Sequence, residues 1–192
     1  DIFPLTEQVA WPAGLPDHLS ATQIGMFQRC SEQYRRRYVL GEKERPGAAL
    51  IWGAADHYAH EQNFVQKIAT HTDIPVEDVK VAFAEGFDRK VEESGGESEV
   101  VWGKDSPGDL KDAGVALVDL YHRKVSPSVQ PVTVERKFEF QIPGVPVPVI
   151  GRVDVETELP AIERKTARAA VREVKPTWRI QGLLYQLESQ KP

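Results

Sequence analysis

The apolar residues of this chain change their spacing once, near Val129, and that change limits the folds open to it. Before this point they recur every three or four residues, as on one face of a helix, for example at Val79, Phe83 and Phe87. After it, in VTVERKFEFQI (132–142), apolar and polar side chains alternate, which is typical of a strand with one buried face. Helices, then strands, then a closing helix predict an α/β (α+β) protein and exclude an all-helical bundle.

The same patterns assign regions and elements along the chain. Residues 1–18 are rich in proline and aperiodic, so they predict an extended lead-in, and 19–192 predict a single domain. Its part 19–125 is mainly helical, and its part 129–192 holds the sheet and a last helix that reaches the chain end, so we expect truncation at the C-terminus. The expected helices are 19–41, 47–69, 75–93, 107–125 and TWRIQGLLYQLE, and the expected strands form a meander of VTVERKFEFQI, VPVPVIGRVDVETE and AIERKT.

Charge and cysteine content exclude several classes of protein. A net charge of −5 argues against binding of nucleic acid by the whole surface. A single cysteine, Cys30, excludes an internal disulfide and favours a reducing, cytoplasmic setting. No apolar run reaches the roughly 18 residues of a membrane span, so we expect no membrane partner. A local basic strip remains, formed by Arg29, Arg35, Arg36, Arg37, Lys43 and Arg45.

Three charged residues, Asp154, Glu163 and Lys165, stand inside apolar strand patterns. Glu163 and Lys165 are two positions apart, so their side chains point to one face of a strand. A meander brings Asp154 across from Glu163, and two converging carboxylates repel unless a cation lies between them. Mg²⁺ or Mn²⁺ would suit such oxygen ligands. A surface hairpin with salt-bridged charges explains the same spacing equally well.

A helical cluster supports the metal-site interpretation. His57 and Glu61 are four apart and share one face of the helix expected over 47–69, while His60 lies on a neighbouring face. A histidine, two carboxylates and a lysine form a workable hydrolytic metal site. Gln181 and Tyr185 are also four apart on the last helix, where they either reach the site or are ordinary boundary residues.

Five short motifs, in this order, together resemble the RecB-like branch of the PD-(D/E)XK nuclease superfamily, which includes CRISPR-associated RecB-like exonucleases and AddB-type nuclease domains. The motifs are LSATQIGMFQRCSEQYRRRYV, GAADH, GRVD, IERKT and QGLLY, with VERKFEFQIPG resembling the strand before the catalytic pair. The resemblance implies a restriction-endonuclease-like core, a mixed β-sheet meander flanked by helices, with an N-terminal helical lobe. Glu-Arg-Lys at 163–165 departs from the Asp-Tyr-Lys that is frequent in this branch.

The resemblance also implies roles for single residues. One or two Mg²⁺ or Mn²⁺ ions would be held by His57, Asp154, Glu163 and the backbone carbonyl of Arg164, and Lys165 would position the attacking water. Gln181 and Tyr185 would organise the site as further catalytic residues. The DNA contacts would come from Arg35, Arg36 and Arg152. The second-rank site candidates are Glu61, Glu135 and, as a possible phosphate contact, Arg152.

Cys30 stands where relatives of this branch place the first ligand of a [4Fe–4S] cluster. The other three cysteine ligands would lie beyond Pro192, so a cluster requires a longer chain that supplies them. An ordinary packed thiol is the alternative for Cys30.

These features predict a metal-dependent deoxyribonuclease, an exonuclease rather than an endonuclease, that acts on DNA ends or single strands. The biological setting would be recombination, repair, or phage- or CRISPR-related DNA processing. Two alternatives stay open. One is a catalytically silent member that binds DNA or a partner, and the other is a restriction-type enzyme or the nuclease subunit of a helicase–nuclease complex.

Overall fold

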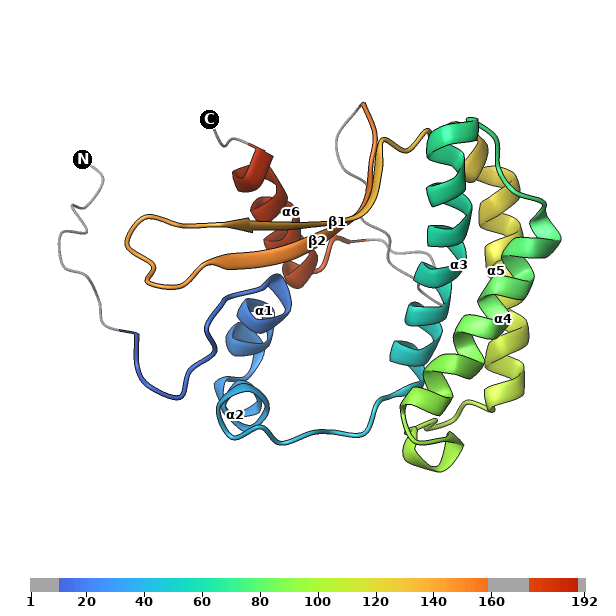
Figure 1. Ribbon diagram of the computed structural model, residues 1–192. Helices are drawn as coiled ribbons and strands as arrows, with labels where there is room; N and C mark the ends of the chain where they lie inside the picture. Colours follow the sequence, from blue (N-terminus) through green and yellow to red (C-terminus); the bar gives the residue numbers. More distant parts are fainter. Residues whose placement is uncertain (1–10, 159–172, 190–192) are drawn as a thin grey trace. The chain divides into compact units, whose positions relative to one another are not determined.

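The computed structural model describes residues 11–158 and 173–189 and shows a mixed α/β chain (Figure 1). None of the helices described is both long and apolar enough to cross a membrane. The third strand expected in AIERKT lies outside the described residues. The elements are α1 (Ala21–Arg29), α2 (Ser31–Tyr34), a π-helical turn η1 (Arg35–Val39), α3 (Ala48–Thr70), α4 (Val76–Glu93), η2 (Glu97–Glu99), α5 (Pro107–Lys124), η3 (Ser126–Ser128), β1 (Thr133–Phe140), β2 (Val149–Glu156) and α6 (Pro176–Ser189).

The chain forms two compact units, and each draws on separate stretches of sequence. Unit 1 contains α1, α2, η1, Lys137–Arg152 and α6, whereas unit 2 contains Arg45–Arg136 and the end of β2 from Val153. The strands β1 and β2 pair in a two-stranded sheet, and the boundary between the units crosses both of them.

The core of unit 2 lies between α3, α4 and α5, which run side by side in Figure 1. All three helices begin and end within one or two residues of the limits that the sequence predicts. Small side chains on α3 let the neighbouring helices approach, and Gly86 of α4 lies directly over Ala55 and Tyr58. The fully buried residues of this core are Ile51, Ala55, Ala59, Val79, Phe83 and Val118.

Replacing Gly114 of α5 with alanine is expected to lower the free energy of unfolding by about 1–3 kcal/mol. A Cβ at this position would overlap the ring of Phe83 and the indole nitrogen of Trp52, which are both packed in the core. Gly108→Ala is the matched control, because a Cβ there meets only Ser106 Oγ at 3.9 Å. Chemical denaturation monitored by circular dichroism would compare the two variants, and equal stability would show that α5 shifts freely.

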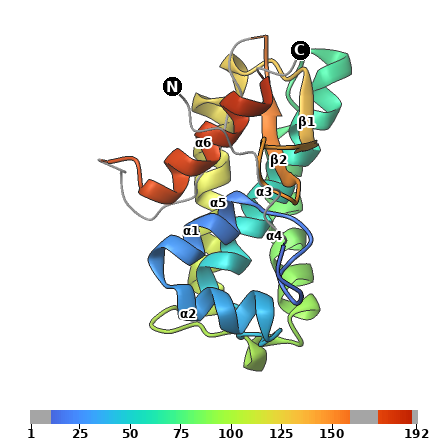
Figure 2. The same ribbon diagram turned by 90° about the vertical axis from the view of Figure 1, so that its left-hand side faces the viewer.

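Helices α1 and α6 pack together in unit 1 (Figure 2). Their contact is close because Gly25 has no side chain, and a Cβ there would lie 2.8 Å from Thr177 Cγ2. Ser20 caps α1, since Gln23 N donates to Ser20 Oγ at 3.3 Å. The apolar side chains of α6 are only partly buried, because Leu184 is buried while Leu183 and Leu187 are exposed.

The prediction of a single helix over 19–41 is wrong, because the helix is interrupted at Cys30. This residue is extended (φ −160°, ψ 103°), and its thiol caps α2 by accepting from Gln33 N at 3.4 Å. The aromatic side chains on the two sides of the break differ in burial: Tyr34 is buried, but Phe27 is 57% exposed. The thiol of Cys30 itself is exposed and forms no disulfide.

The strands depart from simple alternation near their unit 2 ends. Residues 137–140 alternate between exposed and buried as expected, but 133–136 do not. The break coincides with Glu135, whose φ of 52° is left-handed, a conformation that places an irregular residue in a strand. On β2 the successive residues Val153, Asp154 and Val155 are all buried, so both faces of that strand end are covered.

Candidate metal centre

Two carboxylates and one imidazole converge within unit 2. His57 projects from α3, Asp154 from β2 and Glu135 from β1. His57 Nδ1 lies 3.6 Å from Asp154 Oδ1 and 3.7 Å from Glu135 Oε1. One ligand atom from each residue falls within 4.8 Å of the other two. We call these three residues the triad.

The local sequence explains how the triad forms. Asp154 is 6% exposed and stands between Val153 and Val155, whose burial fixes this end of β2. His57 follows the buried Ala55 on α3, and its side chain keeps 29% of its surface exposed. The triad is therefore shielded on the strand side but open to solvent at the imidazole.

The donor set fits a divalent cation. Ligands about 2.1 Å from a metal are separated by about 3.0 Å when they lie at right angles and by about 4.2 Å when opposite. The separations of 3.6 and 3.7 Å fall between these values, and both exceed ordinary hydrogen-bond lengths. Two nearby carboxylates also repel each other, and a cation between them removes that repulsion.

The next histidine along α3 has a different environment. His60 is fully buried, with Nε2 3.5 Å from Asp56 Oδ1 and its ring 4.2 Å from the ring of Tyr121. Its ring packs inside unit 2, in agreement with the prediction that His57 and His60 occupy different helix faces. Glu61, a second-rank candidate on the same helix, is partly exposed and is absent from the triad.

Other predicted site residues belong to two groups. Glu163, Arg164 and Lys165 lie outside the described residues, so their roles stay predictions. Gln181 and Tyr185 lie in unit 1, where Gln181 Nε2 donates to the Tyr185 hydroxyl at 2.8 Å.

The Tyr185 hydroxyl in turn donates to the backbone carbonyl of Arg152 at 2.7 Å, and its ring meets Phe138 edge to face. Arg152 stands on β2 two positions before Asp154. The QGLLY motif thus bonds α6 to the part of β2 that belongs to unit 1.

The basic residues expected to contact DNA are exposed on unit 1, but two of them already have an acidic partner. Arg35 Nε and Arg36 Nε donate to the carboxylate of Glu32 at 2.8 and 2.9 Å. The guanidinium groups of Arg35 and Arg36 are therefore held in place beside each other. Arg152 is exposed on β2.

The carboxyl of Glu32 is expected to titrate near pH 2, because hydrogen bonds from Arg35 and Arg36 lower its pKa from 4.5 to about 2. Unfolding removes these partners, so the ion pairs contribute stability fully above pH 4.5 and lose it as the pH falls toward 2. A carbon-13 NMR titration of the Glu32 carboxyl measures this pKa. In Arg35→Gln/Arg36→Gln it should return toward 4.5, and a pKa that stays low would contradict this cause.

An ion pair between β1 and β2 lies beside the triad in sequence. Arg136 Nε donates to Glu156 Oε2 at 2.7 Å, and Arg136 Nη2 donates to Glu156 Oε1 at 2.5 Å. These bonds, together with one from the Thr133 hydroxyl, lower the pKa of the Glu156 carboxyl. The carboxyl of Glu156 is consequently ionised and paired with Arg136 at neutral pH.

A family model for the PD-(D/E)XK nuclease superfamily matches residues 18–191, which is nearly the whole sequence. The chain belongs to the PD-(D/E)XK nuclease superfamily. No curated protein and no solved structure matches it. Membership in this nuclease superfamily and the chemistry of the triad support the same interpretation, a hydrolytic site that uses divalent metal ions.

Two members of the triad of this PD-(D/E)XK protein, His57 and Asp154, were predicted from the sequence as metal ligands, and Glu135 only as a second-rank candidate. The structure brings all three together, and their role as ligands stays a prediction. The signal for Glu135 was present, since Arg136 interrupts the alternation of VTVERKFEFQI immediately after it. Such an exception can mark a strand bulge that redirects a side chain.

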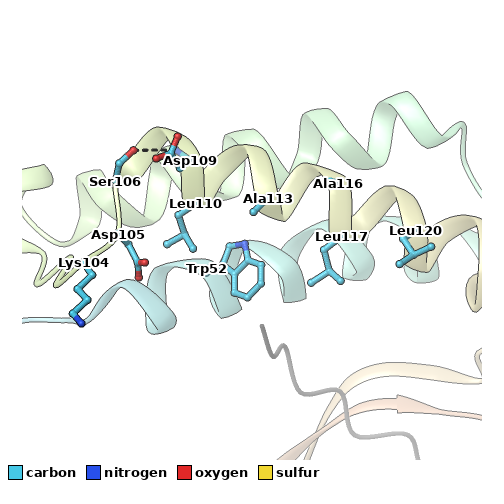
Figure 3. A pocket seen from close by; sticks show the side chains of 10 residues that line it. All are labelled: Trp52, Lys104, Asp105, Ser106, Asp109, Leu110, Ala113, Ala116, Leu117 and Leu120. Atoms are coloured by element: carbon cyan, nitrogen blue, oxygen red, sulfur yellow. Dashed lines mark hydrogen bonds between the residues drawn. The ribbon is translucent and has the colours of Figure 1, made fainter. Parts of the chain in front are cut away.

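A pocket of about 530 Å³ lies elsewhere in unit 2 of this nuclease-superfamily chain, between α3 and α5 (Figure 3). Trp52, Leu110 and Leu117 line its length, with Lys104 and Asp105 at one end. None of the described residues that line it belongs to the triad. We assign this pocket no part in hydrolysis.

Proposed function

We propose that the chain is a metal-dependent deoxyribonuclease of the RecB-like branch and that the triad is part of its active site. The observation that carries this proposal is the approach of His57, Asp154 and Glu135 to within 4.8 Å of one another, in a chain that matches the nuclease superfamily over residues 18–191. Hydrolysis would break a phosphodiester P–O bond, with water as the nucleophile.

The residues of the proposed site have different roles. Asp154 and His57 would hold a divalent cation together with Glu163 and the carbonyl of Arg164. Such a cation would supply Lewis-acid activation of water and offset the charge that develops on the phosphate. The ammonium group of Lys165 would orient the attacking water and add positive charge where negative charge accumulates. Gln181 and Tyr185 act through the backbone of β2.

The chemical types of the ligands favour some metals over others. Carboxylates suit Mg²⁺ and Mn²⁺ alike, but an imidazole nitrogen favours a transition metal over Mg²⁺. We therefore propose tighter binding of Mn²⁺, with Mg²⁺ also able to support activity. An iron–sulfur cluster at Cys30 stays a prediction that depends on cysteines outside this sequence.

DNA is the proposed substrate, as ends or single strands. Arg35, Arg36 and Arg152 are exposed cations that suit phosphate contacts, which hold a strand without reading its sequence. This supports exonuclease action in repair, recombination or defence-related processing rather than cleavage at a specific sequence.

Labelled linear and circular DNA, each single- and double-stranded, would be incubated with the protein in Mn²⁺, Mg²⁺ or EDTA. We expect shortening of linear DNA in either metal, intact circles, and no cleavage in EDTA. Cleavage of circles would replace the exonuclease assignment with an endonuclease. Cleavage that persists in EDTA would remove the metal mechanism, and DNA binding without any cleavage would favour the catalytically silent alternative.

A further inference from the structure

Phe27, on the last turns of α1, exposes a large apolar ring to solvent. Across residues 11–158 and 173–189, every other phenylalanine, tyrosine and tryptophan is buried or partly buried, whereas Phe27 is 57% exposed. A lone apolar side chain at a protein surface needs no explanation. The neighbours of this ring therefore decide whether it has a function.

Phe27 belongs to a row of three aromatic rings within unit 1. The ring centroid of Tyr34 lies 5.5 Å from that of Phe27, edge to face, and 5.2 Å from that of Tyr38. Phe27 and Tyr34 are seven positions apart, a separation that spans about 10.5 Å along a continuous α-helix. The interruption at Cys30 thus lets Phe27 of α1 reach Tyr34 of α2. Tyr34 is buried and fixes the two outer rings, and we call Phe27, Tyr34 and Tyr38 the aromatic row.

Two cations without an acidic partner accompany the aromatic row. Arg37 Cζ lies 5.8 Å from the ring centroid of Tyr38, and Arg29 Nη2 donates to the neutral side-chain oxygen of Gln33 at 2.8 Å. Both arginines are exposed, and within the described part of the chain neither pairs with a carboxylate, unlike the two arginines bound to Glu32. Arg37 and Tyr38 also lie on the π-helical turn η1, a rare conformation that is frequent at functional sites.

Rings beside unpaired cations suit single-stranded DNA. Each unpaired base has a flat face that can stack on an aromatic side chain, and the phosphates next to it carry the negative charge that arginine binds. In duplex DNA the base faces are already stacked on one another, so only the phosphates are available. An apolar protein surface would cover the rings but would give the arginines no counter-charge.

We propose that the aromatic row binds single-stranded DNA, with unpaired bases stacked on Phe27 and Tyr38 and the adjoining phosphates paired with Arg29 and Arg37. This inference rests on the proposed function, because it names the form of DNA that the enzyme holds and adds base contacts to the arginine contacts proposed above. Such a surface accepts strands of any sequence, since every base has a face that can stack.

The test is binding of fluorescein-labelled oligo(dT) of about 16 nucleotides to the full chain, measured by fluorescence anisotropy in EDTA. Phe27→Leu should weaken binding by about 5- to 30-fold, because leucine is apolar but has no flat face, and Phe27→Trp should bind at least as tightly as the wild type. Leu183→Ala is the matched control and should bind like the wild type, because it removes an apolar side chain that is also 57% exposed in unit 1.

Two further measurements separate stacking from charge. A strand of the same length with abasic sugars keeps the phosphates but has no bases, so the wild type should bind it more weakly than oligo(dT). This comparison needs no variant and holds even if Phe27→Leu folds poorly. Arg37→Gln should reduce the slope of log Kd against log salt concentration by about 0.7, as expected for one phosphate contact on a single strand, whereas Phe27→Leu should leave the slope unchanged.

The outcomes distinguish this inference from the proposed function. Equal wild-type affinity for oligo(dT) and the abasic strand, or unchanged oligo(dT) binding in Phe27→Leu, would overturn the stacking role. Wild-type affinity for a duplex of the same length that equals its affinity for oligo(dT) would overturn the preference for unpaired strands. Either result could accompany normal cleavage in Mn²⁺, which would leave the nuclease intact. Conversely, weaker binding by Phe27→Leu in a protein that cleaves no DNA would support the surface and overturn the hydrolysis.

Discussion

Replacing Asp154 with asparagine is expected to lower the rate of DNA cleavage by about 1,000-fold at saturating Mn²⁺. Asparagine has nearly the same shape but no charge, so the strand keeps its packing while the site loses a charged ligand. Asp154 is 6% exposed and lies 3.6 Å from His57 Nδ1, which makes it the most enclosed of the triad residues. The loss should appear mainly in kcat, because the substitution leaves untouched the DNA contacts that we propose for Arg35, Arg36 and Arg152.

The same variant should leave the metal-free protein at least as stable as the wild type. Two carboxylates that approach one imidazole repel each other, and the substitution removes one of the charges. Asp112→Asn is the matched control, since it makes the same change at an exposed position of α5. Cleavage rates from single-turnover assays and melting temperatures would be compared. Asp154→Asn with more than about a tenth of wild-type activity would contradict the active-site assignment.

The largest expected loss of stability comes from Asp73→Ala, at about 3–5 kcal/mol. Lys67 extends from α3 with a side chain only 4% exposed, and its ammonium donates to both Asp73 oxygens at 2.9 Å. It donates a third hydrogen bond to Ser126 O at 2.7 Å. Removing the aspartate would leave a buried cation without its counter-charge and would deprive Asn63 Nδ2 of an acceptor at 2.8 Å.

A double variant distinguishes the loss of a pair from the loss of packing. Lys67→Met/Asp73→Ala should recover much of the stability lost in Asp73→Ala, because a buried cation is replaced by an apolar side chain of similar length. Urea denaturation at pH 7 would give the three unfolding free energies. Single and double variants of equal stability would show that the ammonium reaches water and that the pair contributes little.

Much of the fold followed from periodicity. The three long helices of unit 2 were predicted to within one or two residues, because their apolar side chains recur at helical spacing. Ser20 and Ser106 cap their helices through side-chain hydrogen bonds of the kind that local sequence specifies. The sequence also singled out His57 and Asp154, because a histidine on an alanine-rich helix and an acid inside a valine-rich strand are unusual placements. The structure brings both into the triad, and their role as ligands stays a prediction.

Other features depend on tertiary context that no local pattern carries. The break at Cys30 interrupts a stretch whose aromatic spacing fits one helix, and it leaves Phe27 exposed. The left-handed backbone of Glu135 lies next to Arg136, whose partner Glu156 is distant along the chain and comes close only when β1 and β2 pair. The expectation for Glu163 and Lys165 remains a prediction about residues outside the described part of the chain.

The discontinuous make-up of the two units has a consequence for synthesis on the ribosome. The helices α3, α4 and α5 follow one another directly and contact each other locally, so they can fold as soon as they emerge. Helix α1 emerges earlier, but Gly25 cannot pack against Thr177 until α6 has been synthesised. At a synthesis rate of about 5–20 residues per second, that delay lasts roughly 10 s or longer. During that interval α1 has emerged from the ribosome without its packing partner, which makes it a natural target for chaperones.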